Sequence, residues 1–290
     1  MMKKLLYLIV SLSSVGLAEE QIQISPELAE MMKIEPLDPK RLENNFYVGQ
    51  MGAILPQEDY LEATKTYFLQ NDALGIKNVE HSIQGSLLNI EPSQLVFAVM
   101  NSSSLEGLLP TIEKVSLSDF VPNNQTEILV DLPPMVEGEV AKVTDYFPCQ
   151  DYLKFDCVAG TQKNNQYIQK VIVANRVLLD RLLWRIDHSD HNEVILPQGM
   201  NLDMASLPGY GQESTVYMLN LSQAILNITE GKFEDGINGL SQARKRIDIT
   251  YAEKSTPLLI DLMVVIAQTQ YLDQAMDGLL NSGISKKSNI

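Results

Sequence analysis

The sequence predicts a mainly α-helical protein with an N-terminal helical hairpin, an irregular middle section with little strand and a C-terminal helical bundle. Apolar residues recur at helical spacing through the C-terminal half, where proline and glycine separate the periodic segments. Short runs that could be strands occur only in the middle of the chain. With 45% hydrophobic residues in 290, the chain can build a core, as one large domain or two small ones.

The first 18 residues have the pattern of a secretory signal peptide. Lys3 and Lys4 precede an apolar run over residues 5–17, and small residues stand at Gly16 and Ala18. This run is shorter than the roughly 20 residues that span a bilayer, and no cysteine for lipid attachment follows it. We therefore expect cleavage near Ala18; an uncleaved N-terminal anchor is the alternative.

Residues 19–147 form the predicted N-terminal region. Ser25 and Pro26 are a cap and a first-turn residue for a short helix that ends before Pro36. Two further helices, over residues 39–53 and 57–69, make a helical hairpin interrupted at Pro56.

From residue 71 to residue 147 the pattern becomes irregular. Short apolar runs at 95–99 and 127–132 fit either strands or single helical turns, and Asn123–Asn124 and Pro133–Pro134 indicate loops.

Residues 148–285 form the predicted disulfide loop and C-terminal helical domain. Cys149 and Cys157 are eight positions apart, and in an exported chain this spacing favours a disulfide that closes a small loop. A metal site is less favoured, because no histidine lies near the two thiols in sequence.

After the cysteines, apolar periodicity predicts a helix over residues 167–186 and a polar connection over 187–212. Three more helices are expected at 216–228, 233–249 and 257–280. Residues 224–243 are similar to one tetratricopeptide-type helix–turn–helix step, and a short TPR-like array is one interpretation of this pattern. A stable array needs about three units, which makes an isolated helical hairpin the favoured interpretation.

A loop cluster contains Asp187, His188, Asp190 and His191, which have side chains of the types that bind transition metals. The cluster follows a long helix, where histidine also interacts favourably with the helix dipole and its free carbonyls. We therefore assign no metal site and treat these four residues as weak candidates.

On the same predicted helix, Trp184 offers an aromatic contact for a partner, with core packing as the alternative. Arg181 and Arg185 are neighbours on one helical face, either for a partner or for pairing with nearby carboxylates. Phe233, in the later hairpin, completes the set of candidate partner-binding residues.

Composition and motifs argue against several classes of function. A net charge of −15 and a single short basic run at residues 244–246 do not suit nucleic-acid binding. The chain contains no HExxH, P-loop, dinucleotide or EF-hand motif. Residues 239–243 approach a GxSxG elbow, but the last glycine is alanine and no histidine follows. We expect no catalytic residues, no cofactor and no transmembrane segment in the mature chain.

Several short motifs together resemble a group of uncharacterised exported proteins of gamma-proteobacteria. These motifs are Asn45-Phe46-Tyr47, Gly52, Leu132-Pro133, the two cysteines, residues 175–181 and residues 230–233. Ile247-Asp248-Ile249 departs from the group, in which an aromatic–arginine pair is expected. The resemblance implies the export and the layout of the chain only.

These observations favour a soluble, non-enzymatic protein of a Gram-negative envelope, periplasmic or secreted, that binds or helps assemble another envelope protein through its helical hairpins. A small-molecule or lipid carrier is the first alternative. A metal-dependent hydrolase centred on residues 187–191 is the second.

Overall fold

A computed structural model describes residues 35–89, 114–151, 156–197 and 208–282. These residues form helices without strands, apart from two isolated bridges between Asn45 and His191 and between Glu193 and Thr256. The expected mainly α-helical fold is therefore confirmed. The predicted signal peptide, the helix after Ser25 and the run at 95–99 lie outside the described residues.

The chain divides into two compact units. The larger unit contains residues 38–67, 116–195 and 206–290, and the smaller contains residues 1–37, 68–115 and 196–205. This division differs from the expected one at residue 147, because residues 38–67 and 116–147 group with the C-terminal helices. The larger unit holds the hydrophobic core and every site considered below.

The N-terminal helices differ from the predicted ones in length. The segment expected as one helix over 39–53 is a short 3₁₀ helix, η1 (Pro39–Leu42), followed by α3 (Phe46–Gly52). The two separate at Asn44, which has a positive φ of 51°, and the Asn45 side chain then caps α3 by accepting the Tyr47 N–H at 3.0 Å.

Helix α4 (Tyr60–Asn89) begins near the predicted position but runs about 20 residues beyond residue 69. The prediction that regular structure is lost from residue 71 was therefore wrong for residues 71–89. The apolar periodicity weakens there, but no proline interrupts the backbone before Pro92, and a helix needs only its own backbone hydrogen bonds to continue.

The middle section contains η2 (Leu117–Phe120), α7 (Val143–Tyr146) and η3 (Pro148–Asp151), with irregular chain between them. The run at 127–132, which fitted a strand or a helical turn, forms neither. At Asp131 the backbone forms hydrogen bonds with a side chain instead. Its N–H donates to Asn175 Oδ1 at 2.7 Å, and its carbonyl accepts Asn175 Nδ2 at 2.6 Å.

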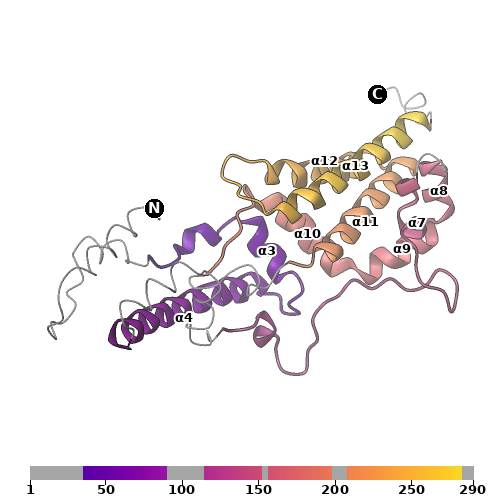
Figure 1. Cartoon of the computed structure of the whole chain (residues 1–290). Coiled ribbons are helices and arrows are strands. Elements are labelled where there is room, and N and C mark those ends of the chain that lie inside the picture. The colour runs from indigo at the N-terminus through magenta and orange to yellow at the C-terminus, as the bar shows by residue number, and fades with distance from the viewer. Residues whose placement is uncertain (1–34, 90–113, 152–155, 198–207, 283–290) are drawn as a thin grey trace. The chain divides into compact units, whose positions relative to one another are not determined.

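The predicted helix over 167–186 is divided into α9 (Asn165–Ala174) and α10 (Arg176–His188), preceded by α8 (Cys157–Lys163). The break falls at Asn175, whose side chain forms the two hydrogen bonds to the Asp131 backbone described above. The last three helices were predicted to within several residues: α11 (Tyr210–Thr229), α12 (Phe233–Thr250) and α13 (Leu259–Asn281). Figure 1 shows these three helices beside one another in the larger unit.

Two glycines of α12 allow it to approach α11 closely. A Cβ at Gly236 would lie 2.8 Å from the Ala224 carbonyl oxygen, and a Cβ at Gly239 would lie 3.0 Å from Ala224 Cβ. Gly231, with a φ of 84°, supplies the left-handed turn between the helices. An αα-hairpin is thus present, and the described residues do not show a repeated tetratricopeptide array.

Candidate functional site

Arg181 and Arg185, two of the candidate partner-binding residues, are buried in this fold. Arg181 donates from Nη1 to the carbonyls of Ala53 (2.7 Å) and Leu55, and from Nη2 to that of Gln57 (2.8 Å). These carbonyls follow the end of α3, where a helix leaves acceptors without internal partners. Among the described residues, Arg181 forms no ion pair with a carboxylate, and its guanidinium donates to these backbone carbonyls instead.

Arg185 lies between α10 and α3. Its guanidinium carbon is 4.9 Å from the centre of the Phe46 ring, and that of Arg246 from α12 is 4.0 Å from the same ring. The Phe46 ring is fully buried, and both guanidinium groups are attracted to it by cation–π interaction, which is stronger where the groups are desolvated. The aliphatic part of the Arg185 side chain packs against Gly49, where a Cβ would lie only 2.7 Å from Arg185 Cδ.

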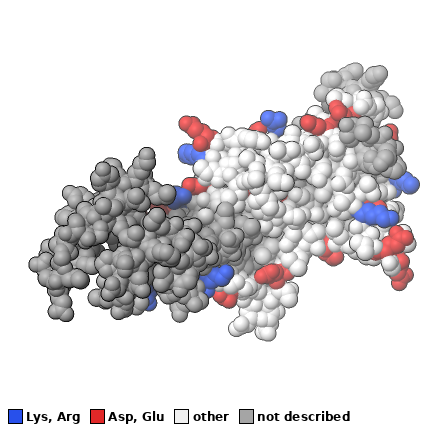
Figure 2. Space-filling model, in the orientation of Figure 1, with Lys and Arg blue, Asp and Glu red and all other residues white. Residues whose placement is uncertain are grey.

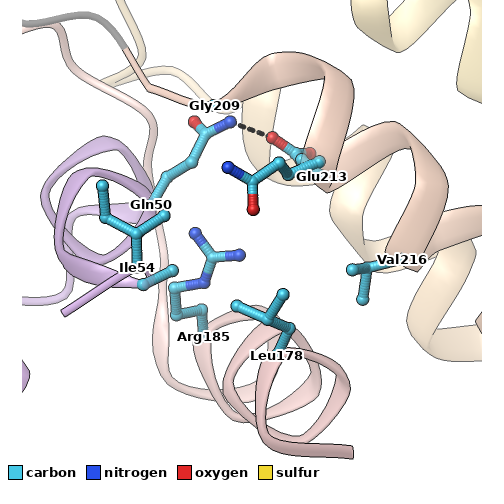
Figure 3. Close-up of a pocket in the computed structure, with 9 residues that line it drawn as sticks. Gln50, Ile54, Leu178, Arg185, Gly209, Glu213 and Val216 are labelled. Carbon is cyan, nitrogen blue, oxygen red and sulfur yellow. Dashed lines mark hydrogen bonds between the residues drawn. The ribbon is translucent and has the colours of Figure 1, made fainter. Parts of the chain in front are cut away.

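Glu213 of α11 is the anionic centre of this buried region. It accepts Arg246 Nε at 2.6 Å and Gln268 Nε2 at 2.9 Å on one oxygen. The other oxygen accepts Gln50 Nε2, as Figure 3 shows. Burial alone would raise the pKa of Glu213, but Arg246 foremost, followed by Arg185 and Gln268, lowers it below its ordinary value. Side chains from α3, α11, α12 and α13 are thereby joined.

Sequence reasoning missed this network. Glu213 lies near a helix start, and Arg246 belongs to the only short basic run; both patterns are typical of solvated surface residues. Their approach depends on how α11 and α12 pack, which is not encoded in the spacing of either residue.

A small cavity adjoins the network. Its lining includes Arg185, Glu213 and Gln50 together with apolar side chains from α10 and α11, and its volume is about 30 Å³. This space holds about two water molecules. It is far below the several hundred Å³ of a typical metabolite or lipid pocket, so this cavity gives the carrier alternative no support.

The structure separates the four weak metal candidates. Asp187 accepts Gln242 Nε2 at 2.9 Å, and His188 Nδ1 is 2.8 Å from the Trp184 carbonyl. Asp190 instead contacts His191 Nδ1 at 2.5 Å, which lowers the pKa of Asp190 chiefly through that hydrogen bond. Within the described part of the chain, no three His, Cys, Asp or Glu side chains are placed to hold a metal ion.

Trp184 and Phe233 are the two candidate partner-binding residues with some exposure. The Trp184 ring is 44% exposed and stacks on His188 with 4.3 Å between ring centres. Phe233 is half-buried at the first position of α12. Neither side chain belongs to the core cluster of the larger unit.

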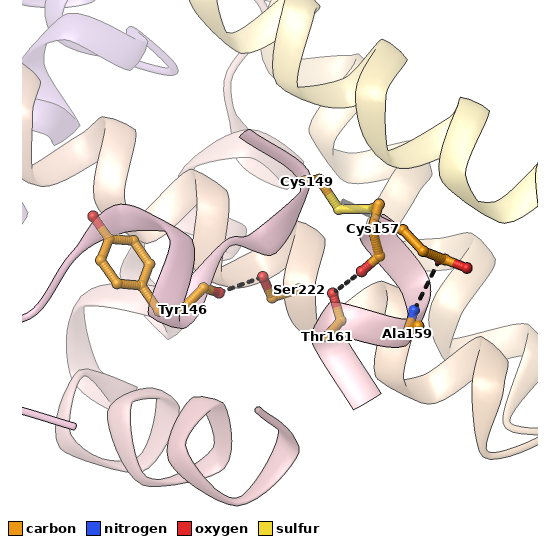
Figure 4. The surroundings of a disulfide bond; sticks show 7 residues. Tyr146, Cys149, Cys157, Ala159, Thr161 and Ser222 are labelled. Carbon is orange, nitrogen blue, oxygen red and sulfur yellow. Dashed lines mark hydrogen bonds between the residues drawn. A yellow bond between two sulfur atoms is a disulfide. The ribbon is translucent and has the colours of Figure 1, made fainter. Parts of the chain in front are cut away.

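The two cysteines lie at disulfide distance, as predicted, with 4.4 Å between their Cα atoms and both side chains buried. The bond links η3 to the start of α8, and Figure 4 shows nearby Thr161 and Ser222 donating to the carbonyls of Cys157 and Tyr146. A Cβ at Gly278 of α13 would lie 2.8 Å from Cys157 Sγ, so the disulfide packs directly on that helix.

An exposed apolar surface lies on the first two turns of α13. We call this surface the α13 face; it consists of Leu259, Ile260, Met263 and Ile266. The spacing of 259, 263 and 266 places these side chains on one side of the helix. The only charged residue among positions 259–266, Asp261, is buried. In the view of Figure 2, the charged side chains of the larger unit lie mostly toward its edges.

No protein-family model, curated protein or solved structure matches the chain. Among the described residues, no helix has the length and apolar character needed to cross a membrane.

Proposed function

We propose that this chain is a non-enzymatic, exported envelope protein that binds another envelope protein through the α13 face. The α13 face carries the proposal. Leu259, Met263 and Ile266 are each more than half exposed, on a helix whose opposite side is packed against α11, α12 and α8. Adjacent exposed aliphatic side chains of this kind commonly mark contact sites between proteins.

The orientation of α13 strengthens this argument. Asp261 and Gln268 point into the protein and are fully buried, whereas the aliphatic residues point outward. An ordinary surface helix has the reverse arrangement, with its polar residues in water. A second apolar surface covering Met263 and Ile266 would remove this exposed apolar area from water.

The surroundings of the α13 face indicate the chemistry of its partner. Asp273 and Asp277 are exposed about two and three turns beyond Ile266 on the same side of α13, and the chain carries a net charge of −15. We therefore expect the partner segment to be an amphipathic helix with aliphatic anchors and with lysine or arginine at one end. A second copy of this acidic chain is disfavoured by like-charge repulsion.

Export to the envelope is the other half of the proposal. The pattern of residues 1–18 favours a signal peptide, and a cysteine pair at disulfide distance fits an oxidising compartment. The carrier and hydrolase alternatives have no comparable observation in the described part of the chain.

The test is site-specific photo-cross-linking in producing cells. A photoreactive residue at Met263, which is 62% exposed, is compared with one at Val173 of α9, which is 71% exposed and lies outside the α13 face. We expect a dominant protein adduct at position 263 and not at 173. The cross-linked partner segment is then identified by mass spectrometry and titrated against purified protein.

The variant Ile266→Glu should weaken binding of that segment at least tenfold, because it places a charge within the apolar contact, whereas Val173→Glu should leave binding unchanged. Equal adducts at the two positions, or binding unaffected by Ile266→Glu, would overturn the proposal.

A further inference from the structure

A second feature of the larger unit concerns the charge of Arg185. Its side chain is 3% exposed, and its hydrogen bond to protein is from Nε to the Arg181 carbonyl at 3.3 Å. Among the described residues, Nη1 of Arg185 has no hydrogen-bond partner. A buried guanidinium with an unsatisfied N–H group is unfavourable, and such a group calls for a ligand or water.

The neighbouring charges do not balance Arg185. Both oxygens of Glu213 are already used by Arg246, Gln268 and Gln50. Arg185 and Arg246 therefore share one close carboxylate, and Arg181 adds a third buried cation. Asp261 is the other buried carboxyl near Arg246; it accepts the Leu258 N–H at 2.9 Å, and burial raises its pKa.

We infer that the cavity beside Arg185 binds one small monovalent anion of about the size of chloride. The cavity of about 30 Å³ accommodates one such ion. Gln212 also lines it, and its Oε1 accepts the Val130 N–H at 3.3 Å. Leu178 and Val216 lower the local polarity, which strengthens the attraction between the guanidinium and an anion.

The same lining limits the charge and size of the ligand. The Glu213 carboxylate borders the cavity and repels negative charge, as does the unpaired Oε1 of Gln50. A divalent tetrahedral anion such as sulfate is too large and too highly charged for this site. The inference is independent of the proposed function, because the cavity and the α13 face share no residue.

The test compares chloride with gluconate, an anion too large to enter, as sodium salts at equal ionic strength and pH 7. We expect the melting temperature of the disulfide-bonded protein to rise by several degrees with chloride and to saturate. Arg185→Met should abolish this increment, while Arg176→Met, which removes an exposed arginine of the same helix, should retain it. Bromide should substitute for chloride.

Line broadening of the ³⁵Cl resonance by the wild-type protein, reversed by excess bromide, gives a direct readout that does not depend on any variant folding. If Arg185→Met fails to fold, anomalous scattering from bromide next to Arg185 in a crystal of the wild-type protein locates the site. Equal melting temperatures in chloride and gluconate, together with no broadening beyond that of a protein without such a site, would overturn the inference in favour of water alone.

Discussion

The close contact between α11 and α12 makes Gly236 a sensitive position for testing the fold. Replacing it with alanine puts a Cβ 2.8 Å from the Ala224 carbonyl oxygen and 2.3 Å from Ile228 Cγ1. Ile228 is β-branched and strongly prefers one χ1 rotamer in a helix, so its Cγ1 does not move aside easily. The carbonyl oxygen belongs to the backbone of α11 and can move only if the two helices separate, so we expect Gly236→Ala to destabilise the protein.

The magnitude follows from two opposing effects. Alanine in a helix is favoured over glycine by about 1 kcal/mol. Forcing an additional methyl group into a closely packed interface costs about 1–3 kcal/mol, and contact with backbone places this site at the upper end. The net loss in the free energy of unfolding should be about 1–2 kcal/mol.

The assay is urea unfolding followed by circular dichroism with the disulfide intact, and Gly211→Ala is the matched control. Gly211 lies in the first turn of α11, and a Cβ there meets nothing within 4 Å. The same chemical change should therefore stabilise the protein by about 0.5–1 kcal/mol at Gly211. If both variants were stabilised equally, the close approach of α11 and α12 would be refuted.

Three further outcomes are expected. Glu213→Gln should lower the free energy of unfolding at pH 7 by about 3–5 kcal/mol, because Arg246 stays buried without its counter-charge. Since the pKa of Glu213 is lowered in the fold, wild-type stability should fall as the pH drops from the ordinary glutamate pKa toward the lower pKa of the folded protein, and urea titrations from pH 7 to about pH 3 should show the variant's deficit shrinking. Replacing Cys149 and Cys157 with serine should lower the free energy of unfolding by about 2–3 kcal/mol. A urea midpoint of the wild-type protein that does not change on reduction would contradict this expectation. Intact mass of the protein from the envelope fraction should correspond to a chain cleaved after Ala18; an uncleaved mass would instead identify an anchor.

The sequence was sufficient for the elements whose signals are local. The last three helices have strong apolar periodicity with glycine or proline between them, and their predicted bounds agree with α11, α12 and α13 to within several residues. The pairing of Cys149 and Cys157 was likewise predictable, because eight positions allow a short loop.

Other features depend on contacts between distant residues. The break at Asn175 arises because its side chain binds the backbone of Asp131, 44 positions earlier. Type and spacing predicted that Arg181 and Arg185 contact a partner or pair with nearby carboxylates. The structure instead supplies backbone carbonyls after α3 to Arg181 and the Phe46 ring of α3 to Arg185, and no local pattern encodes either contact.

Helix α13 has an unusual distribution of polarity. Its inward side contributes Gln268 to the Glu213 network and places Asp261 in the interior, where a regular surface helix would have aliphatic residues. Its outward side carries the aliphatic residues Met263 and Ile266, which apolar periodicity alone would place in the core. If the polar interior were the only cause of this arrangement, polar replacements on the outward side would stabilise the helix in water without loss of function. If a partner covers the α13 face, Ile266→Glu should leave folding unchanged and remove binding, so stability and binding measured on that one variant distinguish the two explanations.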